Sequence, residues 1–507
     1  MRTLTAAVLI SSASLGAAYA QRGGGDWTTA GNDAQRSFWI RSDPKIDKDS
    51  VQKPEFRFLW KVKTANQPSP AVTLNSYIGY RGFRSLAFVV GTSDNVTAID
   101  TDLGRIEWQK APGSGAAAAT TPGCPAGATA GLTRPTVTVF PAPAGRGGGG
   151  RGTPAKSGVG EPGEGAVTIA EIAARAAAMP PNPGGGRGGR GGSGPGAPNP
   201  VPPGATGVYN PFARGPAYVY LLSSDGMLHA MYVSNGEEPN PPVKFLPPGA
   251  HMQGLIVVDN VAYAATVNGC GGVPGQVWAL DLPSKEVATW KPGAGGIVGS
   301  GGPAFGPDAT LYVTASDVLM SLEPKTLKPK EAYKAGAAFT SSPVIFQHKD
   351  KTLIAAASKD GQIHLVDTAA PGTEAARSAG DANALASWQD AAGTRWLLGA
   401  GAHAVTAWKI ADDNGALSLQ PGWTSPGMVS PLAPMVINGV VFAGSGGSRS
   451  TPAVLYALDG STGKELWSSG KAITSYVQGG GLAGGGSQLY LGTVDGTWYA
   501  FGFWIEH

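Results

Sequence analysis

The sequence repeats a strand–turn–strand pattern eight times, and this repeat constrains the fold more than any other feature. The eight units span 87–108, 218–232, 261–290, 310–328, 352–367, 395–410, 440–467 and 489–501. An acidic residue ends the second strand of four units: Asp281, Glu323, Asp367 and Asp459. Successive members lie 42, 44 and 92 residues apart, and the last interval equals two periods of 46. Each unit alternates apolar and polar residues, as half-buried antiparallel strands require.

A period of this length accommodates one four-stranded antiparallel sheet, which cannot bury both of its faces alone. Stacking eight such sheets around an axis solves that problem, so the sequence predicts an all-β, eight-bladed β-propeller. The last unit stops at Trp504 without a closing strand, and 56–64 supplies the missing strand with Trp60 in the closing position. We therefore expect the ring to close by pairing its N- and C-terminal strands. An open β-solenoid is the alternative that this closure argues against.

Glycine and proline are concentrated in one segment. The chain has 77 Gly and 41 Pro, and residues 111–215 contain 27 and 17 of them. We interpret 111–215 as a largely disordered insertion between a first part, 21–110, and the remaining blades, 216–507. A capping pattern that starts at Thr168 predicts one short helix over 170–179. The Arg-Gly runs 145–152 and 186–192 are interpreted as a solvated linker, or alternatively as an arm for a polyanion.

The first twenty residues have the pattern of a secretory signal peptide. Arg2 precedes an apolar stretch, and small residues at 18 and 20 suit cleavage near Ala20. A membrane anchor is the alternative, but the stretch is short for a span of about 20 residues. We expect a periplasmic or extracellular protein without a transmembrane segment. The formal net charge of +3 is too small to predict nucleic-acid binding.

The chain contains two cysteines, Cys124 and Cys270, and neither lies in a CxxC pattern. In an oxidising compartment they are expected to form one disulfide that ties the insertion to the main body. Two separate thiols remain the alternative, because sequence cannot show whether the pair is close enough to bond.

The repeat resembles that of pyrroloquinoline quinone (PQQ) proteins. The best copy runs through 455–459, Leu-Tyr-Ala-Leu-Asp, and 462–467, Thr-Gly-Lys-Glu-Leu-Trp. Trp27, Asp33 and Arg36 also resemble the N-terminal segment of quinoprotein dehydrogenases. The same repeat builds non-catalytic scaffolds, such as the outer-membrane assembly lipoprotein family, so the resemblance implies the fold more strongly than an activity.

In the dehydrogenases, PQQ lies on the propeller axis above a calcium ion. The resemblance places Lys359, in SKDGQIHLVD, where a cation contacts the quinone oxygens, and Asn268 where an amide binds calcium. These two residues are 91 positions apart, about two blades, whereas the family needs one. The catalytic base motif and adjacent cysteines of the family are not found, and the six histidines form no metal-ligand pairs.

No catalytic residue and no metal site are therefore assigned. We expect a PQQ-repeat-like propeller that serves as a binding or scaffold module for a protein or small molecule at its axis or loops. The alternative is a divergent PQQ-dependent dehydrogenase of alcohols or sugars, with PQQ and calcium as its cofactors.

Overall fold

The computed structural model describes residues 25–64, 68–79, 82–91, 94–112, 131–140, 217–293, 295–478 and 481–504. Nearly all regular structure in these residues is β, as the sequence predicts. The helical elements of the described residues are two short 3-10 turns, η1 (Ser50–Gln52) and η2 (Cys270–Gly272). Among the described residues, no helix has the length and apolar character needed to cross a membrane.

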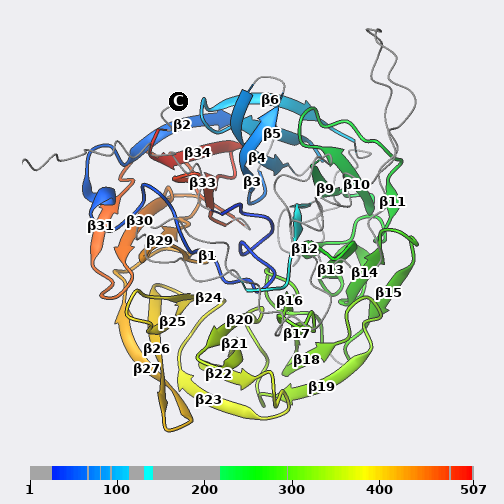
Figure 1. The fold of residues 1–507 in the computed structure, drawn as a ribbon, viewed down its shortest axis with the longest axis vertical. Coiled ribbons are helices and arrows are strands. Elements are labelled where there is room, and N and C mark those ends of the chain that lie inside the picture. The colour runs from blue at the N-terminus through cyan, green and yellow to red at the C-terminus, as the bar shows by residue number, and fades with distance from the viewer. Residues whose placement is uncertain are drawn as a thin grey trace, which may run out of the picture. The chain divides into compact units, whose positions relative to one another are not determined.

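Eight sheets form a ring around a central axis (Figure 1), which confirms the predicted eight-bladed β-propeller. Each blade has four antiparallel strands. From the innermost strand outward, the first four blades contain β3 (Val72–Gly79), β4 (Gly82–Val90), β5 (Val96–Asp100) and β6 (Arg105–Lys110); β7 (Gly131–Thr133), β9 (Tyr218–Leu222), β10 (Met227–Tyr232) and β11 (Val243–Lys244); β12 (Met252–Val258), β13 (Val261–Thr266), β14 (Val277–Asp281) and β15 (Val287–Trp290); and β16 (Ala304–Phe305), β17 (Leu311–Ala315), β18 (Val318–Leu322) and β19 (Pro329–Lys334).

The remaining four blades follow the same order. They contain β20 (Val344–His348), β21 (Lys351–Ser358), β22 (Gln362–Asp367) and β23 (Glu374–Ala379); β24 (Ala384–Gln389), β25 (Arg395–Ala400), β26 (Val405–Asp413) and β27 (Ala416–Thr424); β28 (Met435–Ile437), β29 (Val440–Ser445), β30 (Val454–Asp459) and β31 (Glu465–Ser468); and β32 (Ala483–Gly485), β33 (Gln488–Gly492), β34 (Thr497–Gly502) and β2 (Arg57–Lys63). Strand β2 pairs antiparallel with β34, with Trp60 opposite Ala500, so the two ends of the chain share the eighth blade as expected.

The closing tryptophans of the repeat hold neighbouring blades together. The Trp60 indole on the eighth blade donates a hydrogen bond to Thr101 O of the first blade, at 3.0 Å. The ring lies against Gly104, which has a φ of +63° and whose added Cβ would stand 2.3 Å from the indole. Trp423 contacts Gly463 of the next blade in the same way. The spacing of Gly and Trp in the repeat therefore encodes contacts between blades as well as turns.

The second blade takes its innermost strand from inside the segment 111–215. Strand β7 pairs with β9, and the adjoining β8 (Pro135–Thr136) runs parallel to β12 of the third blade. A three-residue strand in a Gly- and Pro-rich stretch carries no alternation that could reveal it, so the sequence pattern places it in the insertion. The predicted signal peptide and the predicted helix at 170–179 lie outside the described residues.

Residues 25–43, here called the axial segment, lie in the middle of the ring (Figure 1) and contact the innermost part of every blade. Its backbone carbonyls accept hydrogen bonds of 2.7–3.0 Å from five of the blades and from Arg134 beside β7, and β1 (Trp39–Ile40) pairs parallel with β28. Side chains complete the set, since Thr29 bonds to Leu255 O in the third blade and Asp43 accepts from Ser487 in the eighth. The segment thus ties the eight sheets to one another around the axis.

Beyond the axial segment, Lys48 forms an ion pair of 2.9 Å with Asp459 of the seventh blade. Burial opposes the charge of Asp459, but hydrogen bonds from Ser461 and Lys48 outweigh it and lower its pKa to about 2. A carboxyl whose pKa is lower in the native than in the unfolded state stabilises the fold at pH values above its unfolded pKa. This stabilisation is lost as the pH falls through the native pKa.

We therefore expect Asp459→Asn to cost about 1 to 2 kcal/mol at pH 6 and progressively less as the pH falls from 4 to 2. Urea unfolding at pH 6, 4 and 2.5 measures this. Asp413→Asn, at the end of β26, is the matched control. A difference between wild type and Asp459→Asn that does not change with pH would contradict the expectation.

Candidate functional site

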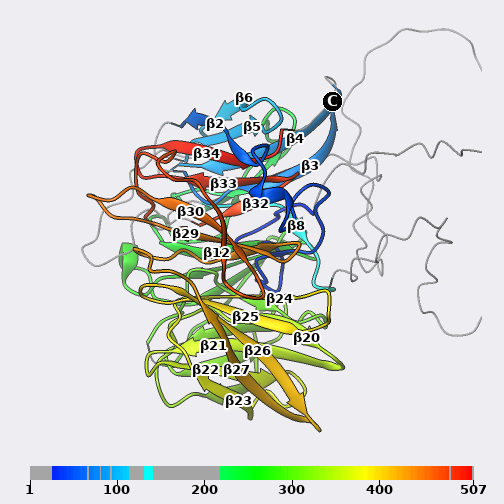
Figure 2. The same cartoon turned by 90° about the vertical axis from the view of Figure 1, so that its left-hand side faces the viewer.

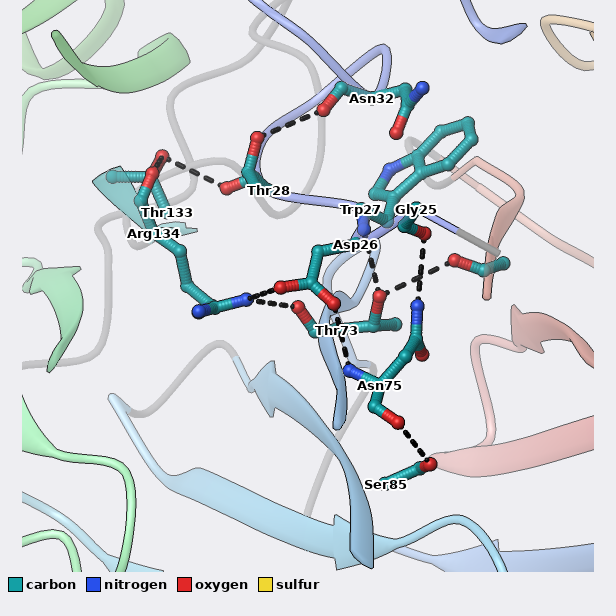
Figure 3. A network of polar contacts seen from close by, with 11 residues as sticks. Gly25, Asp26, Trp27, Thr28, Asn32, Thr73, Asn75, Ser85, Thr133 and Arg134 are labelled. Carbon is teal, nitrogen blue, oxygen red and sulfur yellow. Dashed lines mark hydrogen bonds and ion pairs between the residues drawn. The ribbon is translucent and has the colours of Figure 1, made fainter. Parts of the chain in front are cut away.

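A network of polar contacts joins the axial segment to the first and second blades (Figure 3). Arg134 donates from one Nη1 to Asp26 Oδ2 at 2.6 Å and to Thr73 O at 2.7 Å. The other carboxylate oxygen of Asp26 accepts from the backbone of Asn75 at 2.8 Å, and the Trp27 backbone N–H donates to Thr73 Oγ1 at 2.8 Å. In the side view of Figure 2 the dark blue axial segment and the cyan strand β8 lie next to each other. The Asp26–Arg134 pair therefore fastens the backbone of the axial segment to β3 and β7.

Arg36 fastens the same segment to the third and fourth blades. Its side chain is 1% exposed and donates to Gly254 O at 2.8 Å and to Pro303 O at 2.9 Å. It also donates to Thr29 Oγ1 and to Ala30 O within the segment. Burial lowers the pKa of Arg36 to about 9, and the nearby Asp33 carboxylate opposes this decrease. The residues that resemble a dehydrogenase N-terminus therefore hold the centre of the ring together.

The structure places the two proposed cofactor residues on the same face but not in the same blade. Lys359 lies in the turn between β21 and β22 of the fifth blade, and Asn268 lies between β13 and β14 of the third. Both side chains are exposed. Asn268 Oδ1 accepts from the backbone of Gly275 at 3.2 Å, while Lys359 makes no side-chain hydrogen bond or ion pair to a described residue. The fourth blade separates them, so their joint role stays a prediction.

The donor set does not fit a calcium–PQQ centre of the expected kind. Calcium takes six to eight oxygen ligands, usually with carboxylates among them. In the described part of the chain, no group of three His, Cys, Asp or Glu side chains could hold a metal ion. The oxygen of Asn268 is engaged within its own loop. No reaction step is therefore derived through PQQ.

Cys270 lies in η2, within the same loop as Asn268, and is 2% exposed. Cys124 is outside the described residues, so the disulfide between Cys124 and Cys270 stays a prediction.

Two blades contain a serine, a histidine and a glutamate in the order of a catalytic triad. In the fifth blade, Ser358 Oγ lies 2.8 Å from His364 Nε2, and His364 Nδ1 lies 2.7 Å from Glu374 Oε1. In the second blade the corresponding distances are 3.0 Å for Ser223 to His229, and 3.0 Å for His229 to Glu238.

These sets hold strands together. Ser358 is 2% and His364 1% exposed, so no substrate reaches them. The Asp360 carboxylate accepts the Ser358 proton at 2.5 Å, in competition with the histidine. Burial opposes the charge of Glu374, but hydrogen bonds from Tyr333 and His364 hold its pKa below the usual range.

The sequence carries a signal for both sets. Ser-x-Asp-Gly-x-x-His occurs at 223–229 and again at 358–364, with the same spacing. Identical spacing in two blades indicates a recurring strand contact, because a reaction needs only one such site.

Among the described residues, the first blade carries the most prominent exposed apolar surface. Ile78 and Phe83 face each other across the β3–β4 hairpin and are 66% and 59% exposed. Leu103 and Ile106, in and beside the turn that joins β5 to β6 of the same blade, are also exposed. An ion pair of 2.5 Å between Arg84 and Glu107 connects β4 to β6 below the hairpin. We call these four apolar residues the first-blade surface. Sequence alone could not find it, because strand alternation does not show which apolar face is left uncovered.

Comparison with solved structures supports the fold. A europium-containing methanol dehydrogenase superposes with a TM-score of 0.57 at 12% identity, covering 95% of this chain and 98% of that one. The quinohemoprotein alcohol dehydrogenases of Pseudomonas putida HK5 and Comamonas testosteroni give TM-scores of 0.56 and 0.55 at 12% and 14% identity. These cover 96% and 95% of this chain and 81% of each dehydrogenase.

At these identities the likeness shows the fold alone. The expected structural resemblance to quinoprotein dehydrogenases is therefore confirmed at the level of the propeller. No protein-family model matches the sequence. A search of curated proteins also finds no match.

Proposed function

We propose that the protein is a secreted or periplasmic PQQ-repeat-like propeller that acts as a binding or scaffold module for a protein partner. The exposure of Ile78 and Phe83 on a hairpin of the first blade carries this proposal. Clustered apolar side chains of this size that remain in water are typical of protein-interaction sites. The secretory pattern of the first twenty residues supports the compartment.

A propeller suits this task because it holds its surface loops and hairpins on a rigid ring. Here the axial segment bonds to every blade, and the Arg84–Glu107 pair braces the hairpin from the outer strand. A partner would therefore meet a preorganised surface and lose little affinity to ordering of the hairpin.

The double variant Ile78→Ser/Phe83→Ser is expected to weaken partner binding about thirtyfold or more, as removal of a buried apolar anchor costs about 2 kcal/mol. Proteins of the cell envelope are captured on the immobilised wild type, and the affinity of each is then measured with purified components. Val287→Ser, an exposed apolar position on β15, is the matched control.

A partner that binds wild type, Val287→Ser and the double variant equally would contradict the role of this surface. The dehydrogenase alternative is tested with PQQ and calcium on the same protein. A rise in melting temperature with PQQ, together with dye reduction by an alcohol or an aldose, would overturn the binding-module proposal.

A further inference from the structure

Three basic side chains come from the end of the axial segment and from the fifth and sixth blades. Arg41 follows β1, His348 ends β20 and Arg395 begins β25. His348 and Arg395 each flank the turn between the first and second strands of their blade. In an antiparallel blade this turn lies on the face opposite the Lys359 turn. The cluster is therefore separate from the region where the family resemblance would place a cofactor.

An indole brings the two guanidinium groups together. The Arg41 guanidinium carbon lies 4.1 Å from the centroid of the Trp39 ring, and that of Arg395 lies 5.5 Å from the same ring. Arg395 also lies 5.8 Å from the centroid of Phe346. Stacking on aromatic rings stabilises a guanidinium and leaves its N–H groups directed outward in its own plane.

Three nitrogens of this cluster have no hydrogen-bond partner among the described residues. Arg41 Nε, Arg395 Nε and His348 Nε2 are buried without a hydrogen-bond partner. Arg395 is 5% exposed, and the one hydrogen bond of its side chain to a described residue is a long one of 3.4 Å to Gln389. Neither arginine forms an ion pair with a carboxylate of the described residues. A buried guanidinium without an acceptor is costly, so such groups normally have a partner.

The acidic groups nearby are engaged elsewhere. Asp33, whose charge acts on Arg41, accepts hydrogen bonds of 2.9 and 2.5 Å from the backbone and hydroxyl of Ser37. Burial raises the pKa of Asp33, which weakens it further as a counter-ion for Arg41. Arg36 adds another positive charge beside Asp33.

The acids of the two blades are engaged as well. Asp412 forms an ion pair of 3.1 Å with Lys349, and Asp390 accepts from the Trp396 indole at 2.9 Å. Asp350 acts on His348 only weakly, as the smallest of the effects on its pKa. Burial and the charges of Arg395 and Lys349 together lower the pKa of His348. Positive charge therefore exceeds negative charge around the unpaired donors.

We propose that Arg41, Arg395 and His348 form a binding site for a tetrahedral oxyanion of the phosphate class. Its donors come from three separate chain elements, and a tetrahedral ion presents oxygens in more directions than a planar carboxylate. The bound ion would accept hydrogen bonds from the buried N–H groups and would join the axial segment to the fifth and sixth blades.

The test titrates purified wild type with inorganic phosphate, sulfate and succinate at constant ionic strength, by calorimetry and by melting temperature. Phosphate and sulfate should bind and raise the melting temperature above the value in matched chloride. Arg41→Gln and Arg395→Gln should each weaken phosphate binding at least tenfold. Lys409→Gln, an exposed position on β26 of the sixth blade that also loses one positive charge, should bind like wild type.

If Arg395→Gln fails to fold, Arg41→Gln still tests the proposal, because the Arg41 side chain is only half-buried. The proposal is overturned if phosphate has no effect beyond chloride, if both glutamine variants bind it like wild type, or if succinate binds and phosphate does not. A loss of binding in Lys409→Gln equal to that in Arg41→Gln would also overturn it, because the effect would then reflect net charge alone.

Discussion

Replacing Arg36 with alanine is expected to lower the free energy of unfolding by about 4 kcal/mol. The fully buried guanidinium donates to the carbonyls of Gly254, Pro303 and Ala30, which belong to the third blade, the fourth blade and the axial segment. Alanine would leave these carbonyls buried without donors and would open a cavity between two blades. A buried acceptor that loses its partner costs about 1 to 3 kcal/mol.

Two further variants show whether the loss of stability comes from the hydrogen bonds of Arg36 or from the loss of a positive charge. Arg36→Lys keeps the charge but cannot span three carbonyls, so we expect a loss of about 2 kcal/mol. Arg57→Ala, at an exposed position on β2, should change stability by less than about 0.5 kcal/mol. Urea unfolding followed by tryptophan fluorescence measures all three.

Hydrogen exchange adds a local readout. The amides of Phe305 and Ser387 donate to the axial segment, at Ala34 and Ser37 respectively. If Arg36 anchors that segment, peptides that contain these amides should exchange faster in Arg36→Ala. Unchanged exchange, with an unfolding midpoint equal to that of Arg57→Ala, would show that Arg36 does not fasten the blades.

His364→Ala is expected to lower the free energy of unfolding by about 3 kcal/mol. The imidazole fills a buried space and contacts Ser358, Glu374 and the Tyr333 hydroxyl at 2.7–3.0 Å. Its loss removes one hydrogen-bond partner from a polar group on each of three strands. His403→Ala, at an exposed position between β25 and β26, is the control and should be nearly neutral.

The same variant tests whether the Ser–His–Glu set is catalytic. A fluorophosphonate probe, which labels activated serines, should leave wild-type Ser358 unmodified because the hydroxyl is buried and bonded to Asp360. Labelling of Ser358 that disappears in His364→Ala would refute the structural role and indicate a hydrolase.

The repeat made much of the fold predictable. The structure contains eight blades, one for each strand–turn–strand unit. Strand β2, which carries Trp60, closes the eighth blade by pairing with β34. These features are local or periodic, so they leave a pattern in the sequence. Strand β7 was not predictable, because three residues carry no period and its pairing with β9 spans the whole of 141–216.

The candidate sites were much less predictable. The family resemblance drew attention to Lys359 and Asn268, which the ring places in the fifth and third blades with another blade between them. The first-blade surface depends on which apolar side chains the neighbouring blades leave uncovered. The positions of Ile78 and Phe83 in the sequence do not indicate that their side chains stay exposed.

The sequence alone therefore determined the architecture of this protein: strand periodicity set the sheets, and the Gly and Trp positions set how one sheet packs on the next. Only the tertiary structure showed that residues 25–43 bond to every blade, and that Arg41 and Arg395 share one indole. The physical reason is distance along the chain. Arg36 and Pro303 are 267 positions apart, and ring closure, rather than any local pattern, brings such residues into contact.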